Sequence, residues 1–139
     1  MDASDWTSLV ESAKGITDLY ATPPSLNGGA CELFYVHIDE RGTSVTLGFE
    51  TSAMPSYPPA AWTAKEYNTL EFHVKFTGVK GLRIAGWDSS ARHATVGLSR
   101  VEGDAGLVVS LEGPGSFLGF TASASSVTRV RPYLAAKGQ

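Results

Sequence analysis

The feature that most constrains the fold is a two-residue alternation of apolar and polar side chains, which recurs in short runs from residue 31 onward. It is clearest in TLEFHVKF, where the apolar residues at positions 70, 72, 74 and 76 alternate with Glu71, His73 and Lys75. Successive side chains of a strand point to opposite faces, so this period predicts a half-buried strand.

Turns rich in glycine, proline and serine divide the chain into eight predicted strands. These strands cover residues 31–39, 44–50, 69–76, 82–87, 93–101, 106–111, 116–122 and 126–132. The first two flank the short turn ERGT and predict a hairpin. In the first strand, Phe34, Val36 and Ile38 are expected to share one face. Short antiparallel strands of this kind predict a sandwich or a partly closed barrel.

Only the N-terminal segment has a helical period. Ser4 or Asp5 can cap a helix over residues 5–14, and Gly15 is placed to end it. Its apolar stripe consists of Trp6, Leu9, Val10 and Ala13. We therefore expect a mainly β chain in which one N-terminal helix packs on the β region, residues 31–132, followed by a short tail, residues 133–139.

The chain has 139 residues, which is the usual size of a single domain that buries its own core. Its one cysteine, Cys31, lies in an apolar run and predicts a buried, inert thiol. The N-terminus is acidic and polar, and no run of residues approaches the length of a membrane span. We expect a soluble cytoplasmic protein without membrane contact.

The charges of the chain are distributed unevenly. Residues 1–70 have a net charge of −6, whereas residues 71–139 have a net charge of +3. Two oppositely charged halves predict a dipolar molecule, unless folding mixes the halves. A nucleic-acid-binding protein normally has one concentrated basic patch instead, so we expect no nucleic-acid partner.

No catalytic or metal-binding motif stands out. The three histidines, His37, His73 and His93, fall on three different predicted strands without ligand spacing within any of them. There is no GxSxG motif, and the glycines of EGPGSFLGF do not have the spacing of a phosphate-binding loop. We expect neither enzymatic activity nor a cofactor or metal.

The sequence supports a protein-binding surface better than a catalytic site. Aromatic and arginine side chains dominate the energetics of protein interfaces, and the chain has such residues next to its predicted loops. The candidate contact residues are Asp39, Glu40, Glu50, Trp62, Tyr67, Arg83 and Trp87. Three positions are open for Trp87. A bulge at Gly86 can turn it toward the core, the helix can cover it, or it can form an exposed pair with Arg83.

The order of motifs resembles the immunity protein 50 family of bacterial polymorphic toxin systems. The resemblance runs from Trp6 to Val130 through PPSL, HIDERGTSVTLGFE, PSYPPAAW, EYNTLEFHVKFTGV, LRIAGWD and GPGSFLGFTAS. The positions that match are Trp6, Pro24, Leu26, Asp39, Gly42, Trp62, Phe76, Gly86, Trp87 and Phe120. These positions look mainly structural.

The resemblance implies a non-enzymatic immunity protein that binds and neutralises a cognate toxin. We expect it to be a monomer or a weak homo-oligomer. The acidic first half of the chain suggests steering toward a basic toxin. Two alternatives stay open on the residues alone. One is a general protein-interaction module, and the other is a small-ligand-binding β-barrel whose cavity is lined by Phe34, Phe49, Phe72 and Phe76.

Overall fold

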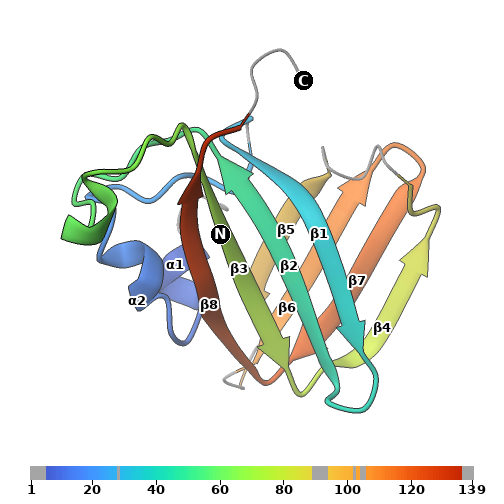
Figure 1. The fold of residues 1–139 in the computed structure, drawn as a ribbon. Helices are drawn as coiled ribbons and strands as arrows, with labels where there is room; N and C mark the ends of the chain where they lie inside the picture. The colour runs from blue at the N-terminus through green and yellow to red at the C-terminus, as the bar shows by residue number, and fades with distance from the viewer. Residues whose placement is uncertain (1–5, 28, 89–93, 102, 104–105, 136–139) are drawn as a thin grey trace.

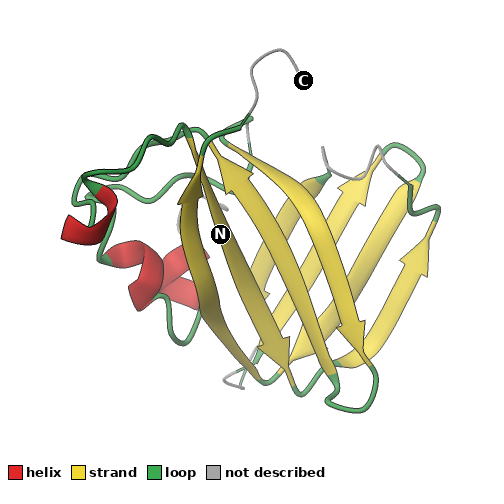
Figure 2. Cartoon of the chain, in the orientation of Figure 1, coloured by secondary structure: helices red, strands yellow, loops and turns green. Residues whose placement is uncertain are grey.

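The computed structural model describes residues 6–27, 29–88, 94–101, 103 and 106–135, and these form two antiparallel four-stranded sheets (Figures 1 and 2). Sheet A has the order β1-β2-β3-β8, with β1 Cys31–Asp39, β2 Ser44–Thr51, β3 Thr69–Thr77 and β8 Ala124–Tyr133. Sheet B has the order β4-β7-β6-β5, with β4 Lys80–Ala85, β5 Thr95–Arg100, β6 Leu107–Gly113 and β7 Ser116–Ala122. The predicted mainly β class is confirmed, and the sheets do not close into a barrel.

Aromatic side chains fill the space between the sheets. Phe49 stacks on Phe72 at 5.5 Å between ring centroids, and Phe76 meets Phe120 edge-on at 5.4 Å. Trp6 stacks on the other side of this cluster, 5.5 Å from Phe72, and is fully buried. These phenylalanines therefore form a packed core instead of the walls of a ligand cavity.

The predicted N-terminal helix is interrupted. Helix α1 spans Trp6–Leu9, and helix α2 spans Lys14–Thr17. Between them, the amide of Ser12 donates to the carbonyl of Ser125, and its own carbonyl accepts from the amide of Val127. Ser12 thus pairs with the free edge of β8, which a continuous helix cannot do because its backbone groups bond internally.

Gly15 accordingly lies inside α2 and does not end a helix. A β-carbon at this position would lie 3.4 Å from the side chain of Val130, so the glycine lets α2 approach β8 closely. The apolar stripe itself is as expected, since Trp6, Leu9, Val10 and Ala13 are all buried. A third short helix, η2, covers Ala60–Trp62.

The N-terminal segment, residues 6–27, also covers the edge of sheet B on the same side of the sandwich. The side chain of Asn27 donates to the carbonyl of Val96 on β5 at 3.0 Å and accepts from its amide at 2.8 Å. This pairing imitates a neighbouring strand. The segment therefore covers part of the edges of β8 and β5, whereas β1 and β4 lie at the opposite side, away from α1 and α2 (Figure 1).

Strand β1 has a bulge, which corrects the predicted alternation along it. The register with β2 shifts between Leu33 and Tyr35. Leu33 therefore points inward together with Val36 and Ile38, and Phe34 is displaced outward with 44% of its surface exposed. The expectation that Phe34 faces a cavity or the core is wrong, because the extra residue reverses the face of everything before it.

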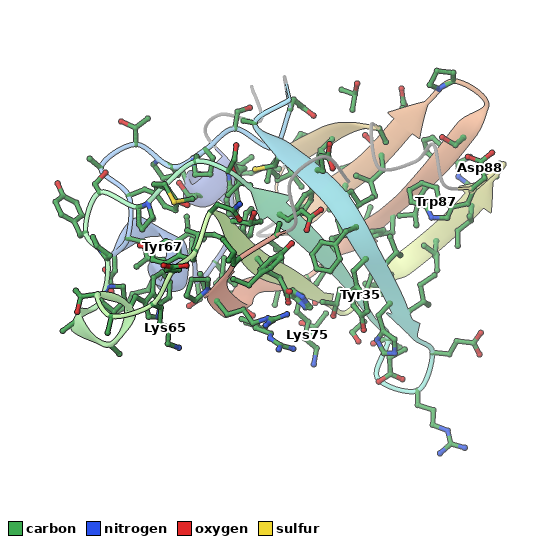
Figure 3. The ribbon with its side chains drawn as sticks, turned by 45° about the horizontal axis from the view of Figure 1, so that its top comes forward. Tyr35, Lys65, Tyr67, Lys75, Trp87 and Asp88 are labelled. Carbon is green, nitrogen blue, oxygen red and sulfur yellow. The ribbon has the colours of Figure 1, made fainter. Side chains whose placement is uncertain are left out.

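Trp87, which is labelled in Figure 3, follows strand β4 and packs partly buried against the core. It follows directly on Gly86, whose φ of +60° turns the chain after the strand. The register shift itself lies earlier, between Lys80 and Arg83. Ile84 pairs with the buried Leu118 of β7 and is nevertheless 47% exposed, because β4 is an edge strand.

None of the helices in the described part of the chain has the length and apolar character needed to span a membrane.

Substitution of two glycines with positive φ tests whether the turn before Trp87 depends on a close backbone contact at Gly86. Gly81 and Gly86 have φ values of +65° and +60°, but only at Gly86 would a β-carbon overlap the carbonyl oxygen of Gly115. We expect Gly81→Ala to lower the free energy of unfolding by about 1 kcal/mol through backbone strain. Gly86→Ala should lower the free energy of unfolding by about 1–3 kcal/mol more, because it also overpacks the contact with Gly115. Urea denaturation measures both losses. Equal losses would contradict the close approach at Gly86.

A second prediction concerns the residue that joins the N-terminal segment to the core. Trp6 is 0% exposed, and its indole N–H donates to the carbonyl of Pro24 at 2.9 Å. Trp6→Ala should lower the free energy of unfolding by about 3–5 kcal/mol, since it removes a fully buried aromatic side chain. Trp62→Ala, at a half-buried tryptophan, is the control and should cost clearly less in the same urea titration.

Candidate functional site

The candidate contact residues from the sequence lie in several separate places. Asp39 and Glu40 stand at the β1–β2 turn, where the Asp39 carboxylate accepts from the amide of Gly42 at 3.1 Å. Glu50 lies on the outer face of sheet A. Asp39 thus has a structural task in the hairpin, and Glu50 is at the other end of its strand.

The aromatic candidates are also apart from one another. Trp62 and Tyr67 contact each other edge-on at 5.9 Å beside η2. Arg83 lies over the ring of Phe117, 5.5 Å from its centroid, on the outer face of sheet B. Figure 3 shows Tyr67 and Trp87 on opposite sides of the molecule. No single surface therefore contains all seven residues.

The outer face of sheet A instead brings together side chains from all four of its strands. Three cross-strand rows make up this face: Glu32, Glu50, Glu71 and Arg131; Tyr35, Gly48, His73 and Arg129; and His37, Thr46, Lys75 and Ser126. The antiparallel register places each member of a row beside the next, within reach of a cross-strand interaction. Figure 3 shows Tyr35 and Lys75 on this part of the molecule.

Glu71 is the centre of the hydrogen-bonding network on this face and is only 6% exposed. Arg131 donates to its Oε1 from Nη2 at 3.0 Å and from Nε at 3.2 Å. His73 Nε2 lies 3.2 Å from Oε2, and Arg129 Nε lies 3.8 Å from the same oxygen. One carboxylate thus orients three side chains from two strands.

The environment of Glu71 acts on its pKa in two directions. Burial alone would raise the pKa of this carboxyl, but the hydrogen bond from Arg131 and the charges of Arg131, His73 and Arg129 outweigh it. The net effect is a lowered pKa, so Glu71 is held as a carboxylate. Beside this row, the phenol of Tyr133 donates to Glu50, and burial together with this bond raises the pKa of Tyr133 to about 12.

Aromatic rings occupy the middle of the face. Tyr35 stacks on His73 at 5.2 Å and lies 6.2 Å from His37, while Phe34 meets His73 edge-on at 5.9 Å. Gly48 lies beneath them, because a β-carbon there would stand 2.7 Å from Cβ of Tyr35 and 3.2 Å from the ring of Phe34. The glycine allows the two rings to lie across the sheet, with Tyr35 40% and Phe34 44% exposed.

Cys31 is a free cysteine that is buried at the start of β1. Burial raises the pKa of Cys31 to about 11, which makes its thiol a poor nucleophile at neutral pH. Within the residues that the structure describes, no group of three or more His, Cys, Asp or Glu side chains could hold a metal ion. His93, one of the three histidines considered from the sequence, lies outside the described residues.

Sequence reasoning found part of this face and missed the rest. The alternation in β3 correctly placed Glu71, His73 and Lys75 outward, although Glu71 is buried there instead of solvated. The importance of Arg129 and Arg131 was missed because it depends on the pairing of β3 with β8, some 60 residues apart in the chain. The spacing RVR was the only available signal.

The lowered pKa of Glu71 leads to a prediction about stability and pH. A carboxyl whose pKa is lowered on folding stabilises the protein above its ordinary pKa of 4.5 and loses this contribution as the pH falls through the lower folded value. At neutral pH, we expect Glu71→Gln to lower the free energy of unfolding by about 1–3 kcal/mol.

The difference between wild type and Glu71→Gln should shrink as the pH falls below about 4.5. Urea denaturation at several pH values measures it. Glu112→Gln, at an exposed glutamate of β6, is the matched control and should follow the wild type throughout. A difference that stays constant down to low pH would contradict the role of the charge.

Comparison with known proteins gives one match. The family model for immunity protein 50 matches residues 12–133, which is most of the chain. No curated protein and no solved structure matches the chain with significance. The match includes every strand of both sheets. The chain therefore belongs to the immunity protein 50 family.

Proposed function

We propose that the protein binds a cognate bacterial toxin and neutralises it by direct contact, without catalysing a reaction. Membership of the immunity protein 50 family is the observation that carries this proposal. Neutralisation by contact requires a surface that covers part of the toxin, and it requires no chemistry from the inhibitor itself. The proposed site of action is the cytoplasm of the cell that makes the toxin.

The physical properties of the molecule support this function. An inhibitor binds tightly when its contact surface is already ordered before binding, because less conformational entropy is lost in the complex. The side chains on the outer face of sheet A are held in this way by Glu71 and by ring stacking. They are also of the types that contribute most to protein interfaces, namely tyrosine, phenylalanine and arginine.

The proposal is tested by co-expression with a candidate toxin domain chosen from the neighbouring genes. We expect growth arrest when the toxin domain is produced alone and restored growth when this protein is produced with it. A purified mixture of the protein and the inactivated toxin domain should elute together in size-exclusion chromatography. The destabilised variant Trp6→Ala is the control, since loss of the fold should abolish protection.

Failure of the wild-type protein both to protect cells and to bind the toxin domain would overturn the proposal. Protection without a stable complex would contradict neutralisation by direct contact, and it would point to an enzymatic or indirect mechanism.

A further inference from the structure

We propose that the outer face of sheet A is the surface that contacts the toxin, and that the toxin presents a surface of complementary polarity to it. The toxin surface would place cationic groups against Glu32 and Glu50, apolar groups against Tyr35 and Phe34, and carboxylates against Lys75 and Arg129. This inference rests on the proposed function and identifies the surface and the chemistry that perform it.

The charges on this face follow the charge asymmetry of the chain. Strands β1 and β2 come from the half with a net charge of −6, and they contribute Glu32 and Glu50. Strand β8 and all of β3 except Thr69 and Leu70 come from the half with a net charge of +3. They contribute Lys75, Arg129 and Arg131, together with Glu71. Folding therefore keeps the two halves apart across one sheet surface and does not mix them there.

Internal pairing leaves some of these charges free to act on a partner. Glu71 binds Arg131 through both Nε and Nη2, so these two groups largely compensate each other. Arg129 is 57% exposed at its side chain and is only loosely paired, 3.8 Å from Glu71. Lys75 is exposed as well. The exposed cationic groups that Glu71 does not bind closely are therefore those of Arg129 and Lys75.

The centre of the face supplies the apolar contact. Tyr35 and Phe34 are 40% and 44% exposed, yet both are restrained by contacts with His73 and by their position over Gly48. Large rings that are exposed and already ordered lose little entropy on binding, which is the usual property of an interface anchor. Charged groups around such anchors mainly set the orientation and the rate of association.

The outer face of sheet B is the main alternative contact surface, but its central row offers less side-chain area to a partner. Its central row consists of Arg83, Gly119, Ser110 and Gly97. Three of these four residues have a very small side chain or none, so the row presents little area to a partner. Arg83, which lies over Phe117 of the neighbouring row, is the one larger side chain of this row. Sheet B therefore provides the control positions.

The test measures the association and dissociation rates of the purified, inactivated toxin domain with variants of the full-length protein. We expect Tyr35→Ala to weaken the affinity by at least about tenfold, mostly through faster dissociation. Glu32→Lys and Lys75→Glu should each slow association by about threefold to tenfold at low salt, and high salt should remove most of this effect.

Each variant has a matched control away from this face. Tyr57→Ala replaces a tyrosine that is 62% exposed in the loop between β2 and η2. Lys80→Glu and Glu112→Lys reverse exposed charges on sheet B. All three controls should bind as the wild type does. Urea denaturation of every variant distinguishes a loss of binding from a loss of fold.

The outcomes separate the two proposals. If the wild type binds the toxin domain and only the controls on sheet B weaken the complex, the contact surface is wrong while the proposed function stands. If Glu32→Lys or Lys75→Glu accelerates association, the polarity assigned to the toxin is wrong. If the wild type does not bind at all, the proposed function fails and this inference fails with it.

Discussion

The arrangement of this molecule depends on how its sheet edges are satisfied. Each four-stranded sheet ends in two strands whose outer backbone groups have no strand beside them, and such edges favour uncontrolled pairing with other chains. The N-terminal segment solves this on one side of the sandwich. Ser12 pairs with β8, Asn27 imitates a strand beside β5, and Trp6 fixes the segment between them by stacking on Phe72.

Closing one side of the sandwich has a consequence for the two remaining edges. Strands β1 and β4 lie away from the helices, and each contains an irregularity that interrupts its pairing pattern, near Phe34 and near Gly81. Bulges protect an edge because they break the regular row of donors and acceptors. In β1, the same bulge turns Phe34 outward and places it beside Tyr35 on the face that we propose as the contact surface.

That face illustrates how a buried charge can organise exposed side chains. Glu71 lies at the surface of the sheet yet is covered by the arginines that bind it, so its carboxylate orients Arg131, Arg129 and His73. His73 in turn supports the ring of Tyr35. Removal of one member therefore affects the order of its neighbours, which is the behaviour of a preorganised surface.

Alternation and turn residues by themselves determined the mainly β class, all eight strands and most of the inward-facing residues, because side-chain direction in a strand depends only on local backbone geometry. The positions of the charged residues along the sequence likewise determined the separation of charge between the halves of the chain. Only the tertiary structure decided the interruption of the helix at Ser12, the bulge at Phe34 and the burial of Glu71. Each of these depends on a partner distant in the chain, and local patterns contain no information about which strands become neighbours.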